Sequence, residues 1–304
     1  MADMDSKNRN MVRKAQKNGV TIVKKEISDV EDFISMYNET MKKNDAEEYI
    51  IEAISQGFKS VGLSGHSYMY FDEPACMSQE GTLKYVDELK MLKEKYKSQI
   101  EVYVGIEADY YSGYNKLIDK NFGFEYRIGS VHYVKSKIND TYYCVDNTPK
   151  LLEQAISEYD NGDVSTFICA YYDNIMDMII TQKPDILGHL DLPKKFNKDY
   201  KYFDESSDWY TTKIDEVLNV IKENGTIVEL NTGGISRGYI SEPYPSKDIL
   251  KKIKQLGIPV TISSDAHESK NLSFYFQETV DLLKELGFSE CKMLLNGVFQ
   301  NIKL

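Results

Sequence analysis

Asp265 and His267 stand two residues apart at the end of a β-branched run, Val260-Thr-Ile-Ser-Ser-Asp265-Ala-His267. Residues two apart on a strand point to the same side, so both side chains can face one site. Carboxylate oxygens and imidazole nitrogens are good ligands for zinc, manganese or iron. The pair therefore indicates part of a metal centre, although a strand that happens to end in polar residues would look the same.

All four histidines of the chain occupy the same kind of position. Each follows a short apolar or glycine-containing run that is typical of a buried parallel strand. They are His66, His132, His189 and His267. Another predicted strand ends in Glu107-Ala-Asp109 and adds carboxylates. Histidines scattered over a core or a surface would not share this position, so the pattern indicates side chains that converge at the C-terminal ends of strands.

Six residues are candidate metal ligands, which is too many for one tetrahedral zinc and suits a centre of two or three ions. They are His66, Glu107, His132, His189, Asp265 and His267. Neighbouring divalent ions cleave phosphate esters by holding the attacking and the leaving oxygen together. The reaction class that we predict is therefore phosphoester hydrolysis.

A glycine-containing loop could bind the phosphate group. The segment Asn231-Thr-Gly-Gly-Ile-Ser-Arg237-Gly follows a predicted strand, and the guanidinium of Arg237 could grip phosphate with two parallel hydrogen bonds. The alternative for Arg237 is an exposed loop charge. Glu229 on the preceding strand could support a ligand or contact a substrate amine, or could serve in packing or a salt bridge. We expect Asp191 to be a loop or helix-capping residue.

The elements that must position these residues alternate regularly from residue 45 onward. Helices are predicted at 46–56, 82–97, 150–161, 165–181, 209–224, 246–256 and 272–286. Strands are predicted within 57–64 and at 100–107, 124–131, 186–189, 226–231, 258–263 and 291–295, the last followed by a tail. This rhythm predicts an α/β fold of about seven βα units and favours a closed or distorted TIM-like barrel over an open sheet.

Composition excludes several classes of function. The 304 residues, 41% of them hydrophobic, can form a large core, and the net charge of −11 argues against a nucleic-acid partner. The four cysteines form no Cys-x-x-Cys pair, and we find no signal peptide or long apolar segment. We therefore expect a cytoplasmic protein with reduced thiols and no membrane partner. Because the phosphate-binding glycine motifs of nucleotide enzymes are absent, nucleotide-driven phosphoryl transfer and dinucleotide redox chemistry are not expected.

Residues 45–304 resemble the PHP (polymerase and histidinol phosphatase) superfamily, in particular its histidinol-phosphate phosphatases. The matching pieces are Gly-Leu-Ser-Gly-His66-Ser, Gly-Ile-Glu107-Ala-Asp-Tyr-Tyr, Gly-Ser-Val-His132-Tyr, Leu-Gly-His189-Leu-Asp-Leu-Pro, Glu229-Leu-Asn-Thr-Gly-Gly, Tyr-Pro-Ser246 and Ser-Ser-Asp265-Ala-His267. The resemblance implies a distorted (β/α)7 TIM-like barrel with up to three divalent ions, zinc, manganese or iron. It also implies hydrolysis of a small-molecule phosphate ester, L-histidinol phosphate, in histidine biosynthesis.

Carried over by position, the resemblance also implies a role for each residue. Glu107 would bridge two ions, His132 and His189 would complete one site and Asp265 the other, and His66 and His267 would bind a third ion. Glu107, Asp265 and His267 would be catalytic, and Arg237 and Glu229 would bind substrate.

The N-terminal segment 1–44 departs from the family, whose members open with a first strand bearing His-x-His. This chain has no histidine before His66, so the first strand is altered or missing and fewer than three ions are expected. Residues 8–20 and the predicted helix after them resemble a piece of Fem-type aminoacyltransferases, and Thr21–Lys24 could replace the first strand. The alternatives to an impaired histidinol phosphatase are an inactive PHP-fold protein that retains partial metal binding and a PHP phosphoesterase with another substrate.

Overall fold

The computed structural model of the chain describes residues 46–72, 75–112 and 122–304. The segment 1–44, with the replacement strand expected at Thr21–Lys24, lies outside the described residues.

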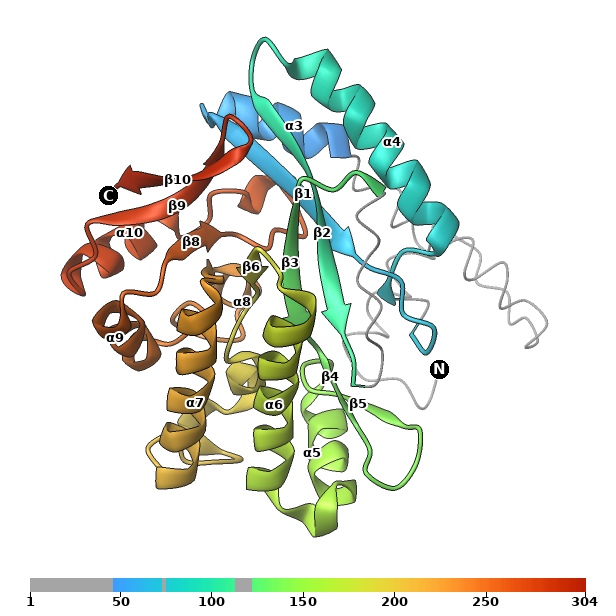
Figure 1. The fold of residues 1–304 in the computed structure, drawn as a ribbon, viewed down its shortest axis with the longest axis vertical. Helices are drawn as coiled ribbons and strands as arrows, with labels where there is room; N and C mark the ends of the chain where they lie inside the picture. Colours follow the sequence, from blue (N-terminus) through green and yellow to red (C-terminus); the bar gives the residue numbers. More distant parts are fainter. Residues whose placement is uncertain (1–45, 73–74, 113–121) are drawn as a thin grey trace, which may run out of the picture. The chain divides into compact units, whose positions relative to one another are not determined.

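A sheet of six parallel strands forms the centre of the described part (Figure 1). In spatial order the strands are β1 (Ser60–His66), β2 (Glu101–Tyr110), β3 (Tyr126–Val131), β6 (Ile186–Leu187), β7 (Ile227–Asn231) and β8 (Val260–Ser263). The spatial order follows the chain order, as successive βα units produce. Because all of these strands pair in parallel, their C-terminal ends lie along the same edge of the sheet.

Helices connect the strands and cover the sheet. They are α3 (Ala46–Ser55), α4 (Gln79–Tyr96), α5 (Pro149–Glu158), α6 (Val164–Gln182), α7 (Asp208–Asn224), α8 (Gly233–Ser236), α9 (Lys247–Leu256) and α10 (Phe276–Glu285). Single 3-10 turns occur at η4 (Asp160–Gly162), η5 (Leu192–Phe196), η6 (Lys198–Tyr200) and η7 (Ser269–Asn271). Every helix that the sequence predicts from residue 46 onward is present, with ends that differ by a few residues, and the helix predicted after residues 8–20 lies outside the described residues. The α/β alternation is therefore confirmed.

Local sequence signals account for several helix ends. Ser78 begins α4 by accepting a backbone hydrogen bond through its hydroxyl, and Thr148 does the same for α5, where Pro149 takes the first helical position. Helices α7 and α9 end at Gly225 and Gly257, whose φ values are 67° and 69°. Glycine adopts this left-handed conformation at no steric cost, which is why it terminates helices.

Two buried clusters make up most of the core. The larger one packs the facing sides of α6 and α7 against the strands β6, β7 and β8, and Figure 1 shows these two helices side by side. The other packs α3 and α4 against β1 and β2. Apolar residues at helical spacing on each helix meet the continuous apolar runs of the strands, as expected for a parallel sheet covered by helices.

The ring of Tyr126 requires glycine on the neighbouring strands. A Cβ atom on Gly105 in β2 would lie 2.2 Å from Cζ of Tyr126, and one on Gly62 in β1 would lie 2.5 Å from its hydroxyl oxygen. Tyr126 itself is buried in a small cluster with Tyr103, Ile128 and neighbouring apolar residues. These two glycines therefore serve a close side-chain approach rather than a turn.

Two hairpins were not predicted from the sequence. The strands β4 (Tyr133–Lys135) and β5 (Tyr142–Cys144) pair antiparallel directly after β3. The prediction of a tail after residue 295 is wrong, because β9 (Glu290–Leu295) pairs antiparallel with β10 (Val298–Lys303). The connecting Asn296-Gly297 has positive φ at both residues, which is typical of a two-residue hairpin turn. The backbone nitrogens of Asn296 and Gly297 donate to the side chains of Glu101 and Tyr103, and these hydrogen bonds attach the hairpin to β2.

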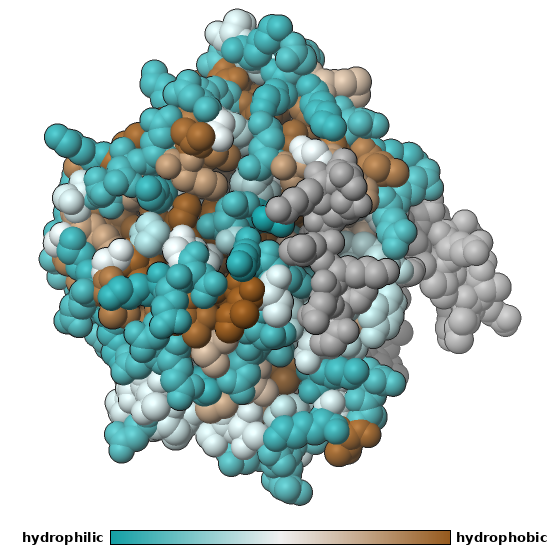
Figure 2. All heavy atoms as spheres, in the orientation of Figure 1, coloured by the Kyte–Doolittle hydropathy of each residue, from teal (hydrophilic) through white to brown (hydrophobic). Residues whose placement is uncertain are grey.

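The surface is mixed in character. Figure 2 shows hydrophilic residues spread across the visible face, with apolar residues exposed in small groups between them. None of the helices in the described ranges has the length and apolar composition needed to cross a bilayer.

Candidate metal centre

Glu107 lies at the centre of three imidazoles at the C-terminal edge of the sheet. Its Oε1 is 3.3 Å from Nε2 of His189 and 3.7 Å from Nε2 of His132, and its Oε2 is 3.6 Å from Nδ1 of His66. His66 ends β1 and pairs in register with Glu107 on β2, while His132 and His189 follow β3 and β6. Four neighbouring strands therefore deliver these side chains to one place.

Three of these residues form a group that fits a divalent ion. One possible ligand atom from each of His66, Glu107 and His132 lies within 4.8 Å of the others. Two nitrogen donors and one carboxylate oxygen suit zinc, manganese or iron. In addition, the buried Nδ1 of His189 has no hydrogen-bond partner in the described part of the chain. In composition and spacing, the donor set therefore fits a divalent metal ion.

Glu107 and the histidines around it shift one another's pKa values. The charge of Glu107 raises the pKa of His66 well above its usual value, against the effect of burial. Burial lowers the pKa of His189, but the hydrogen bond to Glu107 and its charge outweigh this and bring it to about 9. Burial would raise the pKa of Glu107, yet the surrounding histidines hold it below its usual value. A metal ion must therefore displace protons from the imidazoles to bind here.

Asp109 contacts two of the three imidazoles, a role that the sequence reasoning did not assign to it. Its Oδ1 lies 2.6 Å from Nδ1 of His132 and its Oδ2 lies 3.2 Å from Nδ1 of His66. The side chain is only 1% exposed. Its position two residues after Glu107 on the same strand was the available signal, because alternate residues share a face.

Asp265 forms a second group, at the end of β8. Arg237 donates from Nη2 to Oδ2 of Asp265 at 2.8 Å and from Nη1 to its backbone oxygen at 2.9 Å. Nε2 of His267 lies 3.3 Å from the other carboxylate oxygen. The φ of Asp265 is 44°, a left-handed conformation that Asp tolerates better than most residues and that directs the chain into this turn. Burial would raise the pKa of Asp265, but His267 and Arg237 hold it well below its usual value.

The predicted site residues thus fall into two groups within the described residues. His66 lies with Glu107 and His132, whereas His267 lies beside Asp265 and its side chain is 64% exposed. Arg237 is not a loose loop charge, since it makes two hydrogen bonds to Asp265. The assignment of each ligand to a particular ion, and the contact of Arg237 with phosphate, stay predictions.

Glu229 holds the backbone of His189, one of the candidate ligands. This residue is 2% exposed, and its Oε2 accepts hydrogen bonds from the backbone nitrogen of His189 at 2.9 Å and from Asn231 at 3.1 Å. Its substrate contact stays a prediction. Asp191, also buried, accepts from the backbone nitrogen of Ser246 at 2.9 Å. Both carboxylates therefore fix loops at the edge of the sheet.

Lys195 is a second cation near the cluster that the sequence did not suggest. Its Nζ donates to the backbone oxygen of Asp146 at 2.6 Å and to its carboxylate at 3.1 Å, and lies 4.6 Å from the centre of the Tyr239 ring. Burial would raise the pKa of Asp146, but the charges of His132 and Lys195 lower it. Lys195 and Arg237 thus place positive charge beside an otherwise acidic site.

Comparison with known proteins identifies the family. The model of the PHP domain matches residues 35–233, about two thirds of the chain. The chain belongs to the PHP domain family. The match begins inside the segment 1–44 that the sequence sets apart.

Several relatives and solved structures resemble this PHP chain. A probable histidinol-phosphatase of Deinococcus radiodurans is 28% identical over 79% of this chain and 86% of its own length. The histidinol-phosphatase of Bacillus subtilis is 27% identical over 79% of this chain and 91% of its own length. The crystal structure of a putative histidinol phosphatase from Listeria monocytogenes has a TM-score of 0.69 at 21% identity, over 77% of this chain and 93% of that chain.

A further structure, histidinol phosphate phosphatase of Lactococcus lactis complexed with zinc, L-histidinol and phosphate, has a TM-score of 0.59 at 21% identity, over 83% of this chain and 91% of that chain. These two likenesses concern the fold alone. Together with the six parallel strands they confirm the predicted distorted barrel of PHP type.

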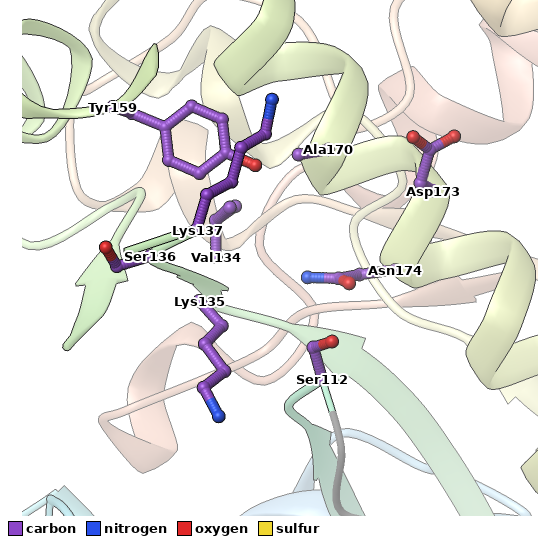
Figure 3. Close-up of a pocket in the computed structure, with 9 residues that line it drawn as sticks. All are labelled: Ser112, Val134, Lys135, Ser136, Lys137, Tyr159, Ala170, Asp173 and Asn174. Carbon is purple, nitrogen blue, oxygen red and sulfur yellow. The ribbon is translucent and has the colours of Figure 1, made fainter. Parts of the chain in front are cut away.

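This chain also has a surface depression of about 270 Å³ beside the β4–β5 hairpin (Figure 3). It is lined by Ser112, Val134, Lys135, Ser136, Lys137, Tyr159, Ala170, Asp173 and Asn174. Lys135 lies 3.1 Å from Asp140, and Lys137 lies 2.6 Å from Asp160, so both cations of this depression are already paired. None of the predicted site residues lines it, so it is separate from the metal centre.

Proposed function

We propose that this PHP protein is a divalent-metal-dependent phosphomonoester hydrolase that converts L-histidinol phosphate and water to L-histidinol and phosphate. The observation that carries the proposal is the carboxylate of Glu107 within 3.3–3.7 Å of three imidazole nitrogens at the C-terminal edge of a PHP barrel. The relatives named histidinol-phosphatase support the choice of substrate.

His66, Glu107 and His132 would hold the first ion, with His189 beside them. Zinc, manganese or iron bound there would polarise the phosphate oxygens and lower the pKa of a water molecule. We also propose that the site holds fewer than three ions. Because Arg237 already pairs with Asp265, that carboxylate has a cationic partner from the chain itself, which favours fewer ions than the family's three.

Arg237 and Lys195 would bind the phosphate dianion, which an acidic cluster would otherwise repel. In the hydrolysis, a water oxygen forms a bond to phosphorus, the ester P–O bond breaks, and the leaving alkoxide takes up a proton. Arg237 is 29% exposed and Lys195 is 12% exposed, so both side chains can reach a ligand from the solvent side. Charge-assisted hydrogen bonds to phosphate are stronger than those between neutral groups.

A cytoplasmic reaction in histidine biosynthesis is part of this proposal. No disulfide joins the four cysteines Cys76, Cys144, Cys169 and Cys291, all of which lie in the described part of the chain, and this suits a reducing compartment.

An inactive PHP-fold protein that binds a single ion is the second candidate. The Arg237–Asp265 pair favours it, because the guanidinium occupies a carboxylate that a further ion would need. The lack of any histidine before His66 favours it as well.

Phosphate release from L-histidinol phosphate separates the two candidates. The purified chain would be supplied in turn with zinc, manganese and iron, and assayed beside His189→Ala, with p-nitrophenyl phosphate as a generic ester. Turnover that prefers histidinol phosphate and disappears in His189→Ala supports the phosphatase and excludes a contaminating enzyme. Turnover of the generic ester alone would favour another substrate. A folded chain that binds metal but releases no phosphate would support the inactive candidate.

A further inference from the structure

Asp109 spans two of the imidazoles with a single carboxylate. Oδ1 lies 2.6 Å from Nδ1 of His132, and Oδ2 lies 3.2 Å from Nδ1 of His66. The backbone around it is fixed as well, because its own nitrogen donates to the hydroxyl of Ser67 at 3.0 Å. The carboxylate is thus held between the ends of β1, β2 and β3.

The chemistry of the carboxylate decides which ring nitrogens carry protons. An ionised carboxylate offers only acceptors, so each imidazole nitrogen in contact with Asp109 must donate. A buried charge has to be hydrogen-bonded, and this side chain is 1% exposed. A neutral imidazole with its proton on Nδ1 presents its lone pair on Nε2.

In His132 the two ring nitrogens are divided between two carboxylates. Nδ1 contacts Asp109, whereas Nε2 faces Oε1 of Glu107 at 3.7 Å, where the ion would bind. In His66, Nδ1 lies closer to Asp109, at 3.2 Å, than to Glu107, at 3.6 Å. In His132, therefore, Asp109 takes Nδ1 and leaves Nε2 to face Glu107, whereas in His66 both carboxylates contact the same Nδ1.

We infer that Asp109 is a positioning residue that keeps the proton of His132 on Nδ1, so that this ring offers Nε2 to a divalent ion. This inference rests on the proposed metal site and adds the group that orients one of its ligands. Carboxylates that orient metal-binding histidines typically change metal affinity 10–100-fold when removed.

The test compares zinc affinity in the wild-type chain and in Asp109→Ala, measured by competition with a chromophoric chelator. We expect about 10–100-fold weaker binding in the variant. Asp146→Ala is the matched control, since it also removes a buried negative charge that acts on His132, while that carboxylate accepts hydrogen bonds from Lys195 and Cys144. If loss of charge alone mattered, both variants would weaken zinc binding equally, and the inference would be wrong.

Nitrogen-15 NMR of the zinc-loaded wild-type chain gives a readout that a purely structural role would not move. We expect protonated Nδ1 and coordinated Nε2 in His132. Zinc bound through Nδ1 of His132, or unchanged affinity in Asp109→Ala, would overturn the inference and leave the metal site standing. A folded wild-type chain that binds no zinc would overturn the metal site and, with it, this inference.

Discussion

The interaction of Glu107 with its imidazoles should stabilise the metal-free chain near pH 6 and much less near pH 10. With an effective dielectric constant of about 20, a charge pair at the observed 3.3–3.7 Å attracts by about 4–5 kcal/mol before desolvation. Breaking a buried pair by removing one partner costs about 3–5 kcal/mol. Replacement of Glu107 by Gln should therefore lower the free energy of unfolding by about that amount when the imidazoles are charged.

The sign of the pH dependence follows from the direction of the pKa shifts. His66 and His189 have pKa values above the ordinary value of about 6.5, that of His189 near 9. Their contribution is fully present below pH 6.5 and is lost as the pH rises through the folded-state values. The lowered pKa of Glu107 acts in the opposite direction, since its contribution is fully present above about pH 4.5 and is lost as the pH falls through the lower folded-state pKa. Glu107→Gln should thus be strongly destabilising at pH 6 and much less so at pH 10.

Urea denaturation followed by circular dichroism, with a chelator present, measures both values. Glu80→Gln is the control, because this glutamate makes an exposed ion pair with Lys84 on α4 and its loss should have no detectable effect at either pH. An equal loss of stability in Glu107→Gln at pH 6 and pH 10 would refute the electrostatic explanation and leave packing or hydrogen bonding as the cause.

Three further predictions concern packing, metal and phosphate. Gly105→Ala should lower the free energy of unfolding, measured by urea denaturation, by about 1–3 kcal/mol, because the new Cβ would lie 2.2 Å from the Tyr126 ring. This loss should nearly vanish when Tyr126 is also replaced by Ala. Equal losses in both backgrounds would contradict the clash. Zinc at 100 times its dissociation constant should stabilise the wild-type chain by about 2.7 kcal/mol and raise its melting temperature in scanning fluorimetry, whereas His132→Ala should respond far less. Arg237→Met should weaken inhibition by inorganic phosphate about 10–100-fold through loss of a charged hydrogen-bond donor, and an unchanged inhibition constant would argue against phosphate contact.

Much of the fold could be predicted because its signals are local. Apolar runs that end in His66, His132 or His189 mark strand ends by themselves, and helical spacing of apolar residues marks the segments between them. The hairpin at the C-terminus also had a local signal in Asn296-Gly297, which was missed. The need for glycine at Gly62 and Gly105 had none, since it depends on a ring from another strand.

Some features of the candidate site could likewise be predicted from the sequence, whereas others could not. The sequence by itself determined which residues with ligand chemistry stand at strand ends, because residue type and strand periodicity are properties of neighbouring positions. Only the tertiary structure decided that Asp109 contacts two imidazoles, that Arg237 binds Asp265, and that Lys195 lies beside Asp146. These contacts join residues 23 to 49 positions apart, and loop closure and side-chain packing, not spacing in the chain, set their geometry.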